Sequence, residues 1–133
     1  MDAAKLATET FNLDKNVKGK YFFSITNNLD NGYMTTGGEA YQTQQVEITT
    51  NFFSGSLGGF VRAVHHEFVH VFQRAVLGYV SSVTHARREY FAHLDSVYNS
   101  DLPAASTAQI SFWKSRIPYY LKEMQKIYQV PAK

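Results

Sequence analysis

The first half of the chain carries the residue pattern of β-strands. Residues 21–26 (YFFSIT) are aromatic or β-branched, as strand residues usually are. Asn31 and Gly32 form the dipeptide most typical of a tight hairpin turn, and residues 33–36 can return as the partner strand. We therefore expect an antiparallel hairpin, preceded by a short amphipathic helix over residues 3–11.

A further strand is predicted at residues 44–50, where polar and apolar side chains alternate. Strand side chains point to opposite faces in turn, so Val46 and Ile48 share one face while Glu47 and Thr49 share the other. One apolar face and one polar face are typical of a half-exposed strand. We expect this strand at an edge of the sheet.

The hydrophobic positions change to helical spacing in the second half of the chain. Residues 57–77 carry a broad apolar stripe and are followed by Gly78, a residue suited to a helix C-terminus. Residues 85–98 form a second amphipathic pattern and residues 101–116 a third, which Pro118 separates from a last helix. A small N-terminal antiparallel sheet followed by a helical half is an α+β fold.

Composition narrows the class of protein. The chain of 133 residues has the length of one domain, so we treat residues 1–133 as a single unit. Hydrophobic residues make up 44% of it, which is enough for a core without disulfides. The chain has no cysteine, which excludes thiolate nucleophiles, cysteine-ligated zinc and iron–sulfur clusters. Its formal charge of +2 comes from scattered basic residues, so we expect no nucleic-acid partner.

Targeting signals are absent from the sequence as it stands. No apolar run approaches the roughly 18 residues of a membrane span, and the N-terminus lacks the apolar region of a secretory signal peptide. We therefore expect no membrane partner, and either a cytoplasmic protein or a domain that is delivered or excised from a longer chain. The sequence leaves the oligomeric state open.

The strongest chemical signal is the run His66-Glu67-Phe68-Val69-His70, which matches the pattern H-E-x-x-H within the longest apolar stripe. Residues four apart on a helix lie on one face with Cβ atoms about 5–6 Å apart, so both imidazoles can bind one metal ion. Zinc suits such ligands. Glu67 is rotated about 100° from His66, where it can reach a water on that ion and act as a general base.

A catalytic zinc usually has three protein ligands and one water, so a third ligand is expected downstream. The longer pattern H-E-x-x-H-x-x-G-x-x-H fails, because Gln73 and Val76 replace its glycine and its last histidine. Glu89 is the leading candidate, since a helical hairpin can bring its carboxylate back to the metal. His85 and His93 flank Glu89 by four residues on the same face.

With these residues the chain resembles the gluzincin metallopeptidases, in which a helix bearing H-E-x-x-H is followed by a second helix that supplies a glutamate ligand. The resemblance covers under half of the chain. The run EYFA at residues 89–92 is similar to the E-x-x-A pattern of the smallest members, found in phage-repressor-cleaving proteins and some bacterial toxins. The resemblance implies a zincin-like fold in which His66, His70 and Glu89 bind one zinc ion and Glu67 activates water.

The surroundings of the metal differ from the pattern of the family. Many larger gluzincins have an aspartate four residues after the glutamate ligand, where this chain has His93, and helical spacing points Asp95 elsewhere. Candidates for stabilising the oxyanion of the reaction are His85, His93, Tyr79 and Tyr90. In the fold of the family, an edge strand before the motif helix pairs with extended peptide, which implies that substrate binds along Val46, Glu47, Ile48, Thr49 and Thr50.

Together these features predict a zinc metallopeptidase that hydrolyses peptide bonds in a peptide or protein substrate. A catalytically inactive zincin-like binding or effector module is the competing interpretation, which a fourth protein ligand from His85 or His93 would favour. A zinc amidohydrolase acting on a non-peptide substrate would share the same metal ligands.

Overall fold

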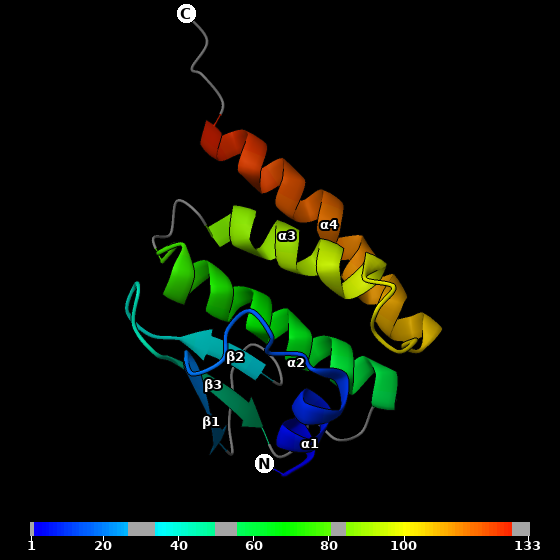
Figure 1. The fold of residues 1–133 in the computed structure, drawn as a ribbon. Coiled ribbons are helices and arrows are strands. Elements are labelled where there is room, and N and C mark those ends of the chain that lie inside the picture. The colour runs from blue at the N-terminus through cyan, green and yellow to red at the C-terminus, as the bar shows by residue number, and fades with distance from the viewer. Residues whose placement is uncertain (1, 27–33, 50–55, 81–84, 129–133) are drawn as a thin grey trace, which may run out of the picture.

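The computed structural model describes residues 2–26, 34–49, 56–80 and 85–128. The elements are, in chain order, α1 (Asp2–Phe11), β1 (Tyr21–Thr26), β2 (Met34–Gly37), β3 (Gln44–Thr49), α2 (Leu57–Val71), the π-helix η2 (Phe72–Val76), α3 (His85–Tyr98) and α4 (Thr107–Tyr128). Figure 1 shows α2 between the small sheet on one side and α3 on the other, with α4 beyond α3. The predicted α+β class is confirmed. Within the described residues, no helix has the length and apolar character that a membrane crossing requires.

The sheet is mixed, whereas the sequence predicted an antiparallel one. Its strand order is β1-β3-β2, and β1 runs parallel to β3 while β2 runs antiparallel to it. Both neighbours meet β3 around Val46. The predicted hairpin between residues 21–26 and 33–36 is therefore wrong, and its turn at Asn31 and Gly32 lies outside the described residues.

β3 is the central strand, although its alternating pattern predicted an edge position. Val46 and Ile48 are buried on one face as expected, but Thr49 on the other face and Gln44 are buried as well. Parallel pairing of β1 with β3 requires a crossover connection, and this connection contains β2. Because β2 lies in this connection and also pairs with β3, β3 has a neighbouring strand on each side.

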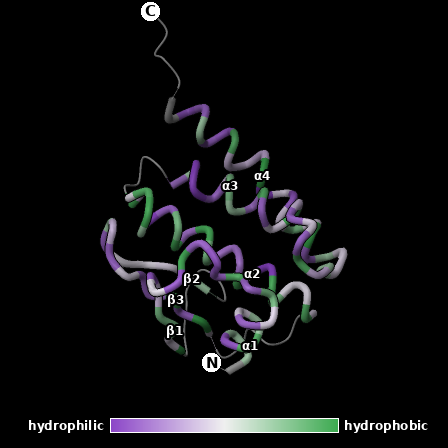
Figure 2. Tube along the Cα trace, viewed as in Figure 1, coloured by the Kyte–Doolittle hydropathy of each residue, from purple (hydrophilic) through white to green (hydrophobic). Residues whose placement is uncertain are grey.

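The hydrophobic core lies between the sheet and α2. The apolar stripe of α2 supplies Val61, Val64, Phe68 and Val71, spaced three or four residues apart. The ring of Phe68 packs 4.5 Å from that of Tyr21 on β1. Figure 2 shows hydrophobic and hydrophilic residues succeeding each other along α2, so the helix has a second, polar side. The same buried cluster also contains Ala4, Ala7, Leu13, Val17, Val46, Ile48, Phe60, Ala75 and Leu102.

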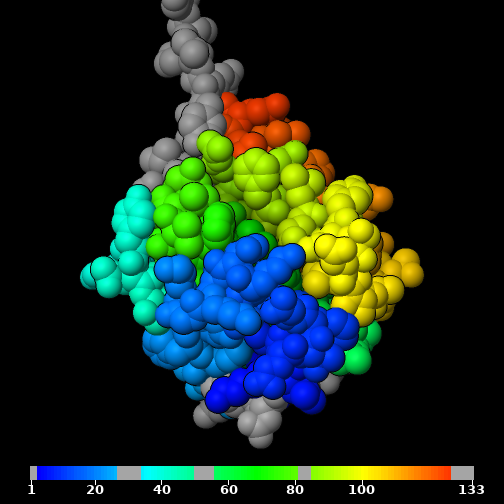
Figure 3. All heavy atoms as spheres, viewed as in Figure 1, coloured from blue at the N-terminus to red at the C-terminus, as the bar shows by residue number. Residues whose placement is uncertain are grey.

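The N-terminal helix closes one side of this core. Ala4 and Ala7 of α1 are buried in the cluster, and α1 packs against α2. On the face drawn in Figure 3, α1 and the turns after it, in blue, lie beside the connection between α3 and α4, in yellow. The sequence predicted this helix within one residue of its observed start.

The motif helix continues without a break into a π-helical turn. α2 begins after Ser56, whose hydroxyl accepts a hydrogen bond from the backbone N–H of Gly59. In η2 the backbone N–H of Leu77 donates to the carbonyl of Phe72, five residues back, at 3.2 Å. Gly78 follows with a φ of 72°, the left-handed conformation that glycine adopts without strain, and ends the helix as its sequence suggested.

α3 has its predicted bounds, but the helix expected from residue 101 begins later, as α4, and runs on through Pro118. Ser106 caps α4: its hydroxyl accepts from the backbone N–H of Gln109, and Gln109 Oε1 accepts from the backbone N–H of Ser106. Proline has no N–H to donate to the carbonyl of Lys114, so Pro118 removes one hydrogen bond. Packing of α4 against α3 supports the helix, and the two predicted helices are one.

Polar contacts hold the C-terminal end of α3 against α2. Arg62 of α2 is buried and donates to the carbonyl oxygens of Ser96, Leu102 and Pro103 at 2.7–3.1 Å. These carbonyls belong to the last turns of α3 and the connection after it, where the helix dipole favours a positive charge. Arg62 therefore fixes the position of α3 along the axis of α2. This position determines which residues of α3 lie opposite the motif residues of α2.

Candidate metal centre

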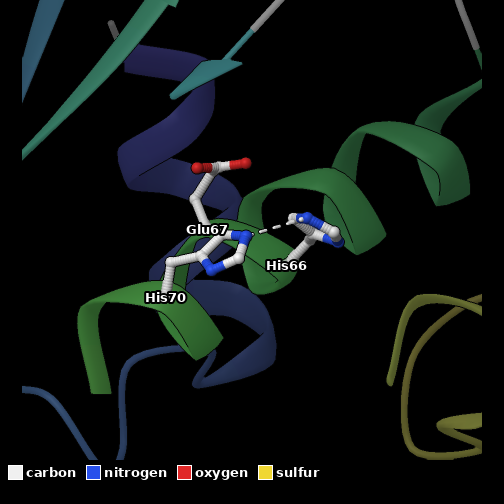
Figure 4. Close-up of side chains that lie close together, drawn as sticks. All are labelled: His66, Glu67 and His70. Carbon is white, nitrogen blue, oxygen red and sulfur yellow. Dashed lines mark hydrogen bonds between the residues drawn. The ribbon is translucent and has the colours of Figure 1, made fainter. Parts of the chain in front are cut away.

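His66 and His70 lie one helical turn apart on α2 and face the same side. Their Nε2 atoms are 3.2 Å apart and their ring centroids 4.8 Å apart. Figure 4 shows the two rings beside each other, with the carboxylate of Glu67 leaving the helix in another direction. His70 is buried and His66 half-buried. The structure thus brings together the two imidazoles that the motif predicts as metal ligands.

Glu89 reaches the same point from α3. Its Oε1 lies 2.8 Å from His70 Nε2, and its Oε2 lies 3.7 Å from His66 Nε2. Ligand atoms around a tetrahedral zinc, with bonds of about 2.0–2.1 Å, are about 3.3 Å from one another. The two Nε2 atoms are 3.2 Å apart and each lies 2.8–3.7 Å from one of the two carboxylate oxygens of Glu89, so the imidazoles and the carboxylate fit one zinc ion.

The tautomer of His66 is set by Ser96 on α3. The hydroxyl of Ser96 donates to the carbonyl of Ala92 at 3.0 Å, so its oxygen is left to accept. His66 Nδ1 lies 2.8 Å from this oxygen and must therefore be the protonated, donating nitrogen. The Nε2 atom of His66 is then unprotonated in the neutral ring, with its lone pair directed toward His70 and Glu89.

The tautomer of His70 is set in the same way by Gln73 in η2. The amide nitrogen of Gln73 donates to the carbonyl of Arg88 at 3.1 Å, which fixes the orientation of the amide. Its Oε1 therefore faces His70 Nδ1, 2.9 Å away, and accepts a hydrogen bond from it. Gln73 is buried and joins the motif helix to α3 while it leaves His70 Nε2 free to bind a metal.

Three hydrogen-bond acceptors consequently face one another, an arrangement that needs a cation or a proton between them. In the metal-free protein, burial lowers the pKa of His70, but its hydrogen bond to Glu89 and the charges of Glu89 and Glu67 more than compensate, so this pKa lies above its usual value. Burial raises the pKa of Glu89, yet hydrogen bonds from His66 and His70 hold it well below its usual range. A proton on the imidazoles and a metal ion therefore compete for the space between the Nε2 atoms and the carboxylate of Glu89.

Glu67 lies beside these donor atoms and is turned toward β2. Its Oε1 accepts a hydrogen bond from the hydroxyl of Thr36 at 2.8 Å, and the same hydroxyl lies 3.3 Å from the backbone carbonyl of Glu67. A carboxylate oxygen of Glu67 is within 4.8 Å of a ring nitrogen of His66 and one of His70. This placement suits a base that acts on a water next to the metal.

His93 is a third ring at the site. Its Nδ1 donates to the backbone carbonyl of Glu89 at 2.7 Å and lies 3.4 Å from Glu89 Oε2. Ligand atoms of His66, Glu89 and His93 all lie within 4.8 Å of one another, so these residues form a second group able to hold a metal. Burial, followed by the nearby charge of His66, lowers the pKa of His93 to about 4, which leaves its ring neutral at pH 7.

The four predicted oxyanion stabilisers separate into two pairs. His85 and His93 line the cleft described below, whereas Tyr79 and Tyr90 do not. The ring of Tyr90 instead packs 5.3 Å from that of Phe91, because helical rotation directs it away from the face that carries Glu89. The structure therefore does not bring Tyr79 and Tyr90 to the cleft, whereas it does bring His85 and His93 there.

The donor atoms open into a cleft of about 1070 Å³ between β2, α2, α3 and α4. On the sheet side the cleft is lined by Met34, Thr35 and Thr36 of β2. The predicted substrate strand does not line it: Val46, Glu47, Ile48 and Thr49 belong to β3, which has a partner on each side, and Thr50 lies outside the described residues. The strand that borders the cleft is β2, an edge strand of the sheet.

Several residues of the site carry no recognisable sequence motif. Ser96 lies seven residues after Glu89 on the same face of α3, and this helical spacing is the one signal that could have identified it. Asp95, as its spacing predicted, points elsewhere, and its carboxylate lies 2.5 Å from Nδ1 of His65. Nothing in the sequence around Thr36 links it to Glu67. The same holds for the α4 residues of the cleft, among them Phe112, Trp113, Arg116 and Tyr120.

Comparisons with known proteins give no family for this chain. A scan against protein-family models, a search of curated proteins and a search of solved structures each found no match.

Proposed function

We propose that the protein is a zinc-dependent metallopeptidase of the gluzincin type, which hydrolyses peptide bonds with Glu67 as the general base. One observation carries the proposal. Nε2 of His66, Nε2 of His70 and the carboxylate of Glu89 converge to within 2.8–3.7 Å, while both Nδ1 atoms are engaged by acceptors that leave the Nε2 lone pairs free. Three convergent acceptors from two helices suit a cation such as zinc.

The catalytic steps follow from the placement of the side chains. Zinc, when bound, supplies a Lewis acid that polarises the scissile carbonyl and allows water to lose a proton near neutral pH. Glu67 accepts this proton as the water attacks, and then donates it to the leaving amine. The hydroxyl of Thr36 holds the carboxylate of Glu67 in place at 2.8 Å. β2, as an edge strand beside the cleft, offers backbone groups to an extended peptide.

The first test is the metal content of the protein. We expect native mass spectrometry, on protein purified without chelator, to find about one zinc ion per chain. His70→Ala removes one of three ligands and should abolish this binding. A protein that binds no zinc, and whose thermal stability does not change on zinc addition, contradicts the proposal.

The second test separates catalysis from metal binding. Glu67→Gln keeps an oxygen that can accept from Thr36 but cannot take a proton, so zinc should remain bound while hydrolysis of a complex peptide mixture falls about 10²–10⁴-fold. Glu123→Gln is the control, because Glu123 pairs with Lys126 on the surface of α4. Hydrolysis at the unaltered rate in the Glu67→Gln protein would exclude Glu67 as the base.

A second candidate function rests on His93. Because His93 has a ligand atom within 4.8 Å of those of His66 and Glu89, it can serve as a fourth ligand in a closed, structural zinc site of a non-catalytic module. In that case His93→Asn should weaken zinc binding strongly. In the open, catalytic site it should leave the zinc affinity nearly unchanged, and a competition titration against a zinc chelator distinguishes the two.

A further inference from the structure

The wall of the cleft opposite β2 is one face of α4. The residues of α4 that line the cleft recur with each helical turn, so they form a continuous stripe along the helix: Ala108, Gln109, Phe112, Trp113, Arg116 and Tyr120. Across the cleft, α2 presents Gly59 and Ala63 before the metal donors. A Cβ atom on Gly59 would lie 2.1 Å from the side-chain amide of Gln109, so this end of the cleft is closely fitted.

Arg116 is the one cation of this stripe. Its guanidinium lies over the ring of Tyr119, 4.1 Å from the centroid, and 5.2 Å from the centroid of Tyr120. Stacking on an aromatic face holds a guanidinium in place. The side chains of Tyr119 and Tyr120 also hydrogen-bond Arg116, but a guanidinium has five N–H donors, so others remain for a ligand. In the part of the chain that the structure describes, no carboxylate lies within ion-pair distance of Arg116.

The other two arginines of the cleft are engaged by the protein itself. Arg74 donates to Gln44 Oε1 at 3.0 Å and to the carbonyl of Gly38 at 2.8 Å. Arg88 is buried and donates to the carbonyl of Tyr79 at 2.6 Å. The lining thus holds three arginines against two glutamates, and both glutamates belong to the metal site. The remainder of the cleft is electropositive, which favours an anionic ligand.

The distance from the metal donors to Arg116 is that of a few peptide residues. The ring of His93 lies 4.8 Å from that of His66 and 5.2 Å from that of Tyr120, and Arg116 lies 5.2 Å from Tyr120. These are three steps of about 5 Å, and an extended peptide advances about 3.3 Å per residue. A peptide held at the metal therefore reaches Arg116 within about five residues of the bond at the metal.

We propose that Arg116 is the specificity-determining residue of this cleft and selects peptides that carry a carboxylate within about five residues of the scissile bond, with an apolar neighbour against Phe112 and Trp113. The inference rests on the proposed peptidase function. A carboxylate is planar and accepts two parallel N–H bonds from a guanidinium, a geometry that neutral side chains cannot reproduce. The carboxylate can belong to a glutamate or aspartate side chain or to the C-terminus of the peptide.

Trp113 allows this selection to be measured without catalysis. It is the single tryptophan of the chain and lies one helical turn from Arg116, so its fluorescence reports a ligand bound beside that residue. The zinc-loaded Glu67→Gln protein is titrated with three leucine-containing tetrapeptides. The first has an internal glutamate and blocked ends, the second has glutamine in its place, and the third has glutamine and a free C-terminal carboxylate.

We expect at least one of the two acidic peptides to bind about tenfold more tightly than the neutral one, and Arg116→Gln to remove this difference. Tighter binding of the peptide with the internal glutamate identifies a side-chain carboxylate as the ligand of Arg116. Tighter binding of the peptide with the free C-terminus identifies the terminal carboxylate. The matched control is Arg87→Gln, because Arg87 is exposed, lies over Tyr79 and Phe91 as Arg116 lies over its tyrosines, and does not line the cleft. This control should keep the full preference.

Equal binding of all three peptides, no binding of any of them, or a preference that persists in Arg116→Gln overturns the role of Arg116. These results are distinct from a failure of the proposed function. A protein that holds zinc and cleaves peptides without an acidic preference refutes only the inference about Arg116. A protein that binds no zinc, but shows a preference for acidic peptides that depends on Arg116, refutes only the peptidase.

Discussion

At the scale of single residues, the orientation and tautomer of His66 and His70 depend on the residues that bond their Nδ1 atoms. Ser96 and Gln73 each bind the Nδ1–H of one imidazole and are anchored in turn by a backbone carbonyl of α3. Such hydrogen bonds fix the ring orientation and increase the basicity of the nitrogen that faces the metal. Many larger gluzincins have an aspartate at the position of His93, whereas in this chain the contact to His66 comes from Ser96, three residues later.

Ser96→Ala tests this role. Without the hydroxyl, His66 loses the partner that fixes its tautomer, so we expect the zinc affinity to fall about 10–100-fold with little change in the fold. A competition titration against a fluorescent zinc chelator measures this change. Ser115→Ala is the control, because its hydroxyl also bonds to a carbonyl of its own helix, that of Phe112, but lies on the exposed side of α4. Equal zinc affinities of the two variants would exclude the positioning role.

At the scale of elements, the first three helices were predictable, whereas the strand pairing and the unbroken α4 were not. The apolar stripe of α2 and the bounds of α3 follow from local spacing, which a sequence displays directly. Strand pairing is non-local: nothing near β1 states that β3, rather than β2, is its neighbour. The H-E-x-x-H residues and Glu89 could be found because their spacing is local to two helices. Thr36 and the stripe on α4 depend on tertiary packing and could not.

Pro118 shows how packing can override a local signal. The residue predicts a break, yet α4 continues through it with one hydrogen bond fewer. Since Pro118 is exposed, Pro118→Ala should restore the bond to the carbonyl of Lys114 and raise the free energy of unfolding by about 1–2 kcal/mol. Urea denaturation followed by circular dichroism measures this, with Ser115→Ala as a control for helix propensity alone. A variant no more stable than the control would show that α4 does not need the bond.

At the scale of the whole molecule, the two sides of α2 are held together by different forces. The contiguous apolar cluster takes its described members from α1, the turns after it, β3, α2, η2 and the connection before α4, and none from α3 or α4. The buried residues of α3 are small or polar, namely Ala86, Arg88, Ala92, His93 and Ser96. The α3–α4 pair is thus attached to α2 and η2 through hydrogen bonds, such as those of Arg62 and Gln73, and through the contacts of Glu89 with His66 and His70.

This division predicts where the protein loosens when metal is removed. Amide hydrogen exchange of α3 and α4 should accelerate on chelation, while β3 and the core side of α2 keep their protection, because only the former depend on the metal centre for docking. Mass spectrometry of peptic fragments resolves the two regions. The His70→Ala protein, with and without chelator, controls for direct effects of the chelator. Uniform acceleration across the chain would show a single cooperative unit instead.

The polar interface between α2 and α3 has a thermodynamic consequence. Two proposed ligands come from α2 and one from α3, so the zinc ion that we propose would bind the docked arrangement and not the separated one. By linkage, each tenfold rise in free zinc above the dissociation constant adds about 1.4 kcal/mol to the docking of α3 and α4. Because the docked α4 supplies the wall of the cleft, the metal concentration then sets the fraction of molecules that possess a complete cleft at all.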